Sequence, residues 1–190
     1  LLAARVPDSV AYCRSIGLDI DAWLTEGLLD LMVAGEFQLS PWSRSAELGH
    51  HHGIQVIAGL SDSRVHSERG PFLRLSEESC RARAAAAWAA GCDGVYLFNL
   101  YRAERPFLSE IHDPALLRTL EQHAFVTVRP WDESSCWFSD GPALATRPLL
   151  TPDHPWLLKP GIPRKAEFEL GDPAGRSGLL MALVPHADAV

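Results

Sequence analysis

Two carboxylates stand directly behind apolar runs of the sequence. Glu36 follows the run that ends at Gly35. Asp62 follows the run that ends at Leu60, and Ser61 stands between that run and Asp62. A pair of carboxylates can act on one bond as general acid and base, or as acid and nucleophile. Each acid also has an ordinary structural role, because Asp62 can cap a turn and pair with Arg64 or Arg69, while Glu36 can stand in an exposed loop. Glu36 and Asp62 are the candidate catalytic residues.

Five other side chains could bind a hydroxyl-rich ligand such as a sugar. Arg5 ends an apolar run and therefore needs a partner; it can hold a catalytic carboxylate or a hydroxyl, or it can anchor a loop acid. Arg64 has the same two roles. Asn99 and Tyr101 end a further run and offer both donors and acceptors, although Asn99 can equally close a turn. Trp42 can stack on a sugar ring or pack beneath its loop.

Other kinds of chemistry find little support in the sequence. The consecutive histidines His50 to His52 would point about 100° apart on a helix, so they cannot face one metal ion together, and positive charge suits the end of a helix. Neither a His-Glu-x-x-His nor a Gly-x-Ser-x-Gly motif is present. The 4 cysteines are widely spread, which predicts reduced thiols. We expect neither a metal site nor a cofactor.

Charge and hydropathy restrict the partners. The 190 residues include 17 basic and 24 acidic side chains, a net charge of −7, and an acidic surface repels nucleic acid. No run of about 18 apolar residues is present, so a membrane span is not predicted. A composition of 47% hydrophobic and 22% charged residues is typical of a globular domain. We expect neither nucleic acid nor a membrane as partner, and the oligomeric state and cellular location stay open.

A repeated unit must position the candidate residues: a helix that ends at a glycine, followed by an apolar run. Helices are predicted over 10–16, 19–26, 43–52, 76–90 and 114–123. The glycines that end the first four are Gly17, Gly27, Gly53 and Gly91. Nearly continuous apolar runs, typical of parallel strands buried on both faces, lie at 1–6, 28–33, 54–60 and 95–99.

Four βα units bring the candidates to one edge of a sheet, because functional residues gather at the carboxyl ends of parallel strands. A small flavodoxin-like sheet would bind phosphate in a glycine-rich first loop, and residues 5–9 contain no glycine. A complete barrel needs about 250 residues, so half a barrel with extra strands matches this length. The predicted fold class is α/β, a partial (β/α)8 TIM barrel consisting of the last four βα units.

The sequence changes character near residue 125. Nine of the 14 prolines lie between Pro130 and Pro185, and short apolar segments at 125–128, 165–170 and 178–184 are predicted as strands between turns. We therefore expect one domain over 1–125 and an antiparallel, partial β-sandwich-like domain over 126–190. Because the chain starts inside an apolar run and stops soon after a predicted strand, we interpret it as a fragment.

Two stretches resemble a bacterial family of glycoside hydrolase-like barrels, similar to the glycosyl-hydrolase-like family 10 group. They are residues 12–30, beginning Tyr-Cys-Arg-Ser-Ile-Gly-Leu-Asp-Ile-Asp, and residues 91–99, Gly-Cys-Asp-Gly-Val-Tyr-Leu-Phe-Asn. The resemblance covers about residues 1–125. It implies an acid/base after the fourth barrel strand, which would precede Leu1, and a nucleophile at the end of the seventh. If 54–60 is the seventh strand, Asp62 is the position-matched carboxylate, although the nucleophile in that clan is usually Glu.

The resemblance implies hydrolysis of O-glycosidic bonds in a carbohydrate substrate by a carboxylate pair, without an organic cofactor. As a fragment, the chain is expected to be inactive by itself. The alternative function is a non-catalytic carbohydrate-binding barrel protein. A metal-dependent sugar isomerase or amidohydrolase relative would place histidines at several strand ends, and here the strand ends carry Arg5, Glu36, Asp62 and Asn99.

Overall fold

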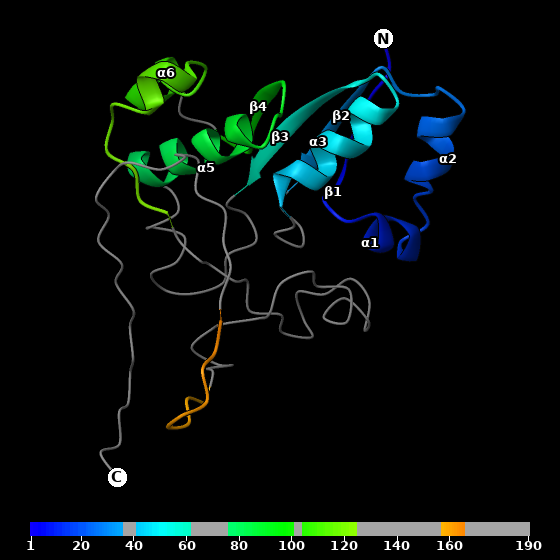
Figure 1. Ribbon diagram of the computed structural model, residues 1–190. Helices are drawn as coiled ribbons and strands as arrows, with labels where there is room; N and C mark the ends of the chain where they lie inside the picture. Colours follow the sequence, from blue (N-terminus) through cyan, green and yellow to red (C-terminus); the bar gives the residue numbers. More distant parts are fainter. Residues whose placement is uncertain (36–40, 62–75, 101–103, 125–156, 166–190) are drawn as a thin grey trace.

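The computed structural model describes residues 1–35, 41–61, 76–100, 104–124 and 157–165, and the first four of these ranges form a layered α/β structure (Figure 1). Its sheet has four strands, β1 (Ala3–Pro7), β2 (Leu31–Gly35), β3 (Gln55–Ser61) and β4 (Gly94–Phe98). They lie in chain order, and each neighbouring pair is parallel. The predicted parallel arrangement is therefore confirmed.

Helices connect the strands. The chain passes from β1 to β2 through α1 (Val10–Ser15) and α2 (Ile20–Thr25), and α3 (Trp42–His51) and α5 (Glu77–Ala89) precede β3 and β4. After β4 come a 3-10 turn, η1 (Pro106–Ser109), and α6 (Pro114–Leu117), which is shorter than the helix predicted there. The four glycines predicted to end helices all adopt positive φ, a conformation that costs glycine less than any residue with a Cβ.

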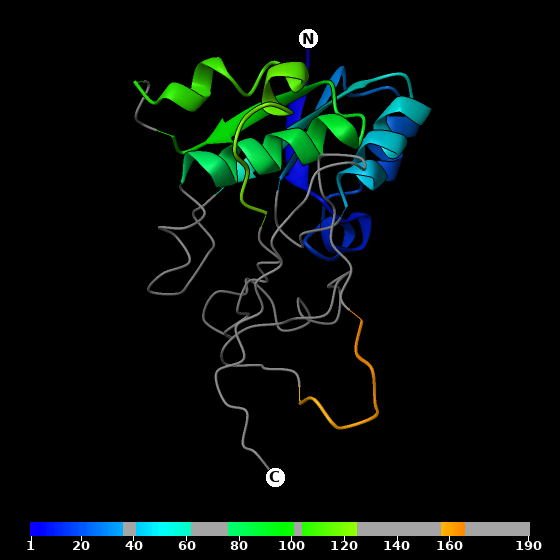
Figure 2. The ribbon, with the colours of Figure 1, turned by 60° about the vertical axis from the view of Figure 1, so that its left-hand side comes forward.

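The hydrophobic core lies on one face of the sheet. The ribbons show helices lying along this face (Figures 1 and 2), and alternate strand side chains pack there against α1, α2, α3 and α5. A parallel sheet whose strand order follows the chain, joined by crossovers of one hand, carries its helices on one face. The strand residues of this core are Val6, Met32, Ala34, Val56, Ala58 and Leu60.

A second cluster joins α5 to η1 and α6. Phe107 and Leu117 are fully buried against the alanine-rich side of α5. Arg81 on α5 holds Glu110 with two parallel hydrogen bonds, from Nε at 2.6 Å and from Nη2 at 3.1 Å. The indole of Trp88 donates to the Ile111 carbonyl at 2.7 Å. These contacts fix the segment after β4 against the helix layer.

The opposite face of the sheet is less covered than the sequence predicted. Val33, Ile57 and Phe98 are half-buried there, and Tyr96 is 42% exposed. The expectation that the strands are buried on both faces is therefore wrong for the described part of the chain. Continuous apolar runs gave that expectation, but only every second side chain of each strand reaches the helices.

The predicted fold class is also wrong in its second part. Of the predicted region 126–190, the structure describes only 157–165, and its one strand-like pairing is an isolated antiparallel bridge between Lys159 and Ile162. Ile162 N donates to the Lys159 carbonyl at 3.1 Å around Pro160 and Gly161, whose φ is 74°, so a tight turn accounts for this bridge. The described residues contain no antiparallel sheet. The spacing of proline and glycine correctly indicates a turn here, but it does not indicate whether strands lie on either side of the turn.

The four described strands do not confirm the predicted half barrel. The described sheet is open, with β1 and β4 at its two edges. The assignment to the last four units of an eight-stranded barrel rested on chain length and the count of units, and neither quantity determines how a sheet closes. The predicted strands at 125–128 and 178–184 lie outside the described residues, as does most of the predicted domain 126–190.

Candidate functional site

The candidate site is the edge of the sheet where the parallel strands end. Gly35 is the last residue of β2 and pairs with Gly59 of β3, and Ser61, the last residue of β3, pairs with Phe98 of β4. In the sequence, Glu36 directly follows Gly35 and Asp62 directly follows Ser61. Glu36, Asp62, Arg64 and Tyr101 themselves lie outside the described residues.

Arg5 and Phe98 meet across the sheet. The guanidinium carbon of Arg5 on β1 lies 3.8 Å from the centroid of the Phe98 ring on β4. Two strands separate β1 from β4, and at about 4.8 Å per strand pair a flat sheet would hold these strands about 14 Å apart. Arg5 is level with Gly94 in the ladder, so Phe98 also lies four residues, about 13 Å, further along its strand. The two Cα atoms would then lie about 19 Å apart in a flat sheet, more than the two side chains span, so the sheet curves or twists toward the face that is turned away from the helices.

Two glycines lie on the same face of the sheet as the contact between Arg5 and Phe98. Arg5 pairs with Val33 in register, and the next residues on the same face of the central strands are Gly35 and Gly59. A Cβ on Gly59 would lie 2.9 Å from the Ala34 carbonyl oxygen, closer than real Cβ contacts allow. Both glycines are buried near the carboxyl ends of β2 and β3.

The environment of Arg5 makes it an anion-seeking group. Burial lowers the pKa of its guanidinium, and Tyr96 on the same face acts in the opposite direction. An arginine stays charged at every physiological pH, so desolvation increases its attraction for a carboxylate or a polar ligand. Phe98 stabilises the cation through its ring face and fixes where the cation stands.

Asn99 ends β4 in the left-handed region, with φ 57°, and its side chain is exposed. Asparagine tolerates this conformation better than most residues, which fits the turn-closing role. The exposed residue lies at the carboxyl edge, so the structure accommodates both roles that the sequence left open.

Trp42 lies in the core. It is the first residue of α3, is 7% exposed and belongs to the cluster on the helix side of the sheet. This placement favours packing over sugar stacking, because a buried indole presents no ring face to a ligand. Arg5 and Trp42 therefore stand on opposite sides of the sheet.

The sequence reasoning missed Asp8. It follows β1 directly, at the same edge as the other strand ends, and is 6% exposed. Its charge and the burial of the site raise the pKa of the neighbouring Cys13 thiol to about 12, with burial the larger cause. The signal was present, since Asp8 follows an apolar run just as Glu36 and Asp62 do, but its neighbour Ser9 made the segment resemble an ordinary helix start.

The histidine cluster belongs to the other edge of the sheet. His50 Nε2 lies 2.8 Å from Asp93 Oδ2, and the same carboxylate oxygen accepts from the Val56 N–H at 2.8 Å. His51 and His52 face each other edge to face. Within the described ranges, no three side chains of the metal-binding types gather in one place.

Comparison with known proteins does not assign the chain to a family. No protein-family model matches it, and a search of curated proteins also finds no match. As for membranes, none of the helices in the described residues combines the length and apolar character needed to cross a bilayer. Function must therefore be argued from the site itself.

Proposed function

We propose that the carboxyl edge of this sheet is a carbohydrate site of the glycoside-hydrolase type, with Asp62 and Glu36 as its carboxylates. The observation that carries the proposal is the contact of Arg5 with Phe98. It places a desolvated cation across β2 and β3, the two strands that lead directly into Glu36 and Asp62 in the sequence.

Hydrolysis of a glycosidic bond needs two carboxyl groups with different pKa values on either side of the anomeric carbon. A cation close to one carboxylate stabilises its charged form and lowers its pKa, which leaves the other group as the proton donor. We assign the ionised role to Asp62 and the acid role to Glu36. Arg5 acts as a positioning residue that keeps the first of them charged.

The second candidate function is carbohydrate binding without catalysis. The described polar groups of the curved face and its carboxyl edge favour it, because the Arg5 guanidinium and the exposed Asn99 amide are hydrogen-bonding groups rather than proton donors of suitable pKa. Both functions use the same edge and the same class of ligand, and they differ in whether Asp62 is required for bond cleavage.

The test compares Asp62→Asn with a matched acid-to-amide variant, Glu47→Gln, which alters an exposed side chain of α3. Release of nitrophenol from a panel of aryl glycosides and binding of the corresponding oligosaccharides are measured for each variant of the complete protein. The hydrolase proposal predicts that Asp62→Asn loses turnover by about a hundredfold or more and retains binding, while Glu47→Gln changes neither.

Turnover that survives in Asp62→Asn would contradict the assignment of Asp62. Saturable binding without turnover by any form would support the non-catalytic function. A lack of both binding and turnover across the panel would overturn the carbohydrate proposal. We also expect the 190-residue chain to be inactive by itself. Hydrolysis by this chain would contradict that expectation, but it would support the hydrolase proposal.

A further inference from the structure

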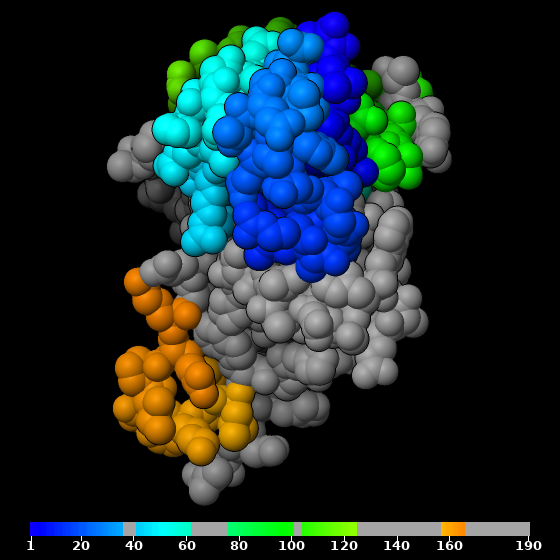
Figure 3. Space-filling model, turned by 90° about the vertical axis from the view of Figure 1, so that its right-hand side faces the viewer, coloured from blue at the N-terminus to red at the C-terminus, as the bar shows by residue number. Residues whose placement is uncertain are grey.

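A cavity of about 270 Å³ lies on the helix side of the sheet, away from Arg5 and Phe98. It is bounded by the end of β1, by α1 and α2, by β2 and by the first turns of α3. Figure 3 shows α1 and α2, in blue, lying beside α3, in cyan, on one surface of the molecule. The cavity belongs to these neighbouring elements and does not share side chains with the proposed carbohydrate site.

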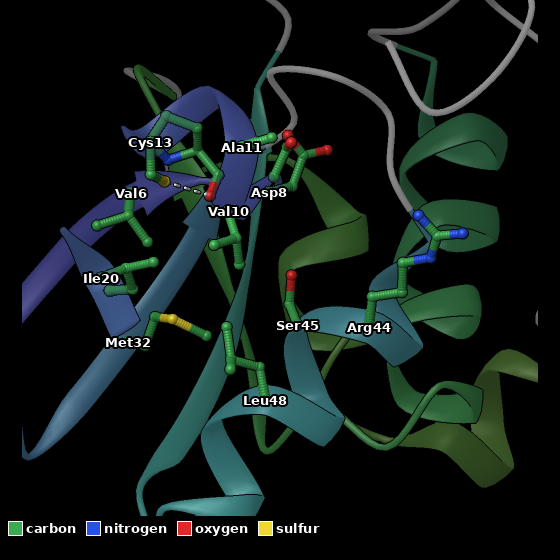
Figure 4. A pocket seen from close by; sticks show the side chains of 12 residues that line it. Val6, Asp8, Val10, Ala11, Cys13, Ile20, Met32, Arg44, Ser45 and Leu48 are labelled. Atoms are coloured by element: carbon green, nitrogen blue, oxygen red, sulfur yellow. Dashed lines mark hydrogen bonds between the residues drawn. The ribbon is translucent and has the colours of Figure 1, made fainter. Parts of the chain in front are cut away.

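The floor of the cavity is apolar and rigid. Val6 and Met32 come from the core face of the sheet and Ile20 from α2, and all three are almost completely buried. Leu48 on α3 completes this surface (Figure 4). Core packing leaves these three side chains almost no accessible surface, so the apolar surface that a small aliphatic group can reach includes the half-buried Val10 and Leu48.

Opposite charges stand on the two sides of the cavity. Asp8 lies on the β1–α1 side and Arg44 on α3, with the buried Ser45 hydroxyl between them (Figure 4). Asp8 is buried, whereas Arg44 is exposed. Asp8 also interacts with other groups of the protein, but a carboxylate has about four lone-pair positions and can accept from a ligand as well.

Thiol chemistry is excluded at this cavity. The Cys13 Sγ donates to the Pro7 carbonyl at 3.4 Å, and its pKa is raised to about 12 by burial and by Asp8. A thiol that stays protonated is a poor nucleophile and a poor metal ligand. The cavity is therefore suited to binding rather than to covalent catalysis.

We propose that this cavity binds a small zwitterion with an aliphatic body, that is, a free amino acid such as leucine. The ammonium group is held by Asp8, the carboxylate by Arg44 at the mouth, and the side chain rests on Val10 and Leu48. A charge of each sign separated by an apolar floor matches this class of ligand better than a simple amine, which Arg44 would repel, or a simple acid, which Asp8 would repel.

The test uses three probes that separate the two charged ends: L-leucine, isopentylamine, which lacks the carboxylate, and 4-methylpentanoate, which lacks the amine. Binding is measured by calorimetry and by chemical-shift titration. L-leucine should bind saturably, and each truncated probe should bind about tenfold or more weakly, because a hydrogen bond to a charged partner is lost.

Two variants complete the experiment. Asp8→Asn, which is isosteric, should weaken L-leucine by about tenfold or more, and Arg44→Gln should weaken L-leucine without weakening isopentylamine. Arg14→Gln is the matched control, since Arg14 lies on α1 and pairs with Asp21 outside the cavity. Three results would each overturn the proposal. They are equal binding of all three probes, an Arg44→Gln variant that weakens only the amine probe, and no saturable binding by L-leucine.

Discussion

The polar side chains at the two edges of the sheet differ in the contacts that they make. At the amino edge, Asp93 accepts from both His50 and the Val56 N–H, and its own N–H donates to the Val56 carbonyl at 2.8 Å. At the curved face and carboxyl edge, Arg5 crosses the sheet to Phe98 and Asn99 is exposed in a left-handed conformation. The polar groups of the amino edge join elements, whereas the other edge carries a partly buried cation and an exposed amide.

Trp42→Ala should give the largest effect and tests whether this residue belongs to the core or to the binding edge. Because the indole is buried, its loss should lower the free energy of unfolding by about 3–5 kcal/mol. Urea unfolding followed by circular dichroism measures this loss. If Trp42 were instead a sugar platform, the variant would keep nearly full stability and lose carbohydrate binding.

Asp93→Ala should destabilise the amino edge by about 1–3 kcal/mol, because the Val56 N–H would remain buried without its acceptor. Val56 itself is 0% exposed, so water cannot easily replace the carboxylate. Thermal and urea unfolding provide the measurement, with Glu47→Ala, which removes an exposed carboxylate of α3, as a control. An unchanged unfolding midpoint would show that this edge is not held by Asp93.

Arg5→Met should change the free energy of unfolding by about 1 kcal/mol or less, because the lost cation–ring contact is offset by relief of desolvation. Carbohydrate binding should fall in the same variant. A small change in stability together with a loss of binding would show that Arg5 serves binding, whereas Asp93 at the amino edge serves stability. Arg5→Met that unfolds as severely as Trp42→Ala would show that Arg5 is structural.

The smallest expected effect is on the pH dependence of stability. The Val56 N–H, and secondly His50, hold the pKa of Asp93 below its ordinary value. A lowered pKa in the folded state contributes stability above the unfolded pKa of about 3.9, and this contribution is lost as pH falls through the folded pKa. Unfolding measured between pH 7 and 2.5 should therefore show a weaker acid dependence in Asp93→Asn than in the wild type. Identical curves would contradict the assigned role.

The local structure of the sheet unit was predictable from the sequence, because each signal is local. Ser76 caps α5 by accepting from Ser79 N at 3.1 Å, and glycines end the helices where the pattern predicted. The start of β2 was predicted three residues too early. The Asp30 N–H donates to the Leu2 carbonyl, the Asp30 carboxylate accepts from the Leu2 N–H, and the paired strand begins only at Leu31. Strand limits depend on such cross-chain contacts, which composition does not reveal.

The site was less predictable than the fold. Arg5 was recognised as a cation in need of a partner, but its contact with Phe98 depends on the curvature of the whole sheet. Asp8 escaped notice because its burial, with 6% of the residue exposed, exists only in the folded chain. In the described residues 157–165, the proline-rich spacing corresponds to a turn and not to the predicted antiparallel sheet, since it indicates where the chain turns and carries no information about what pairs with it.

Chemical-shift mapping with an oligosaccharide panel tests the central claim most directly. Backbone amide shifts of the chain are followed as sugar is added, and the carbohydrate account predicts saturable shifts confined to the carboxyl edge, at Gly35, Gly59, Ser61 and Asn99, which Arg5→Met removes. Shifts confined to the amino edge around Val56 and Asp93, or no saturable shift with any sugar, would contradict it.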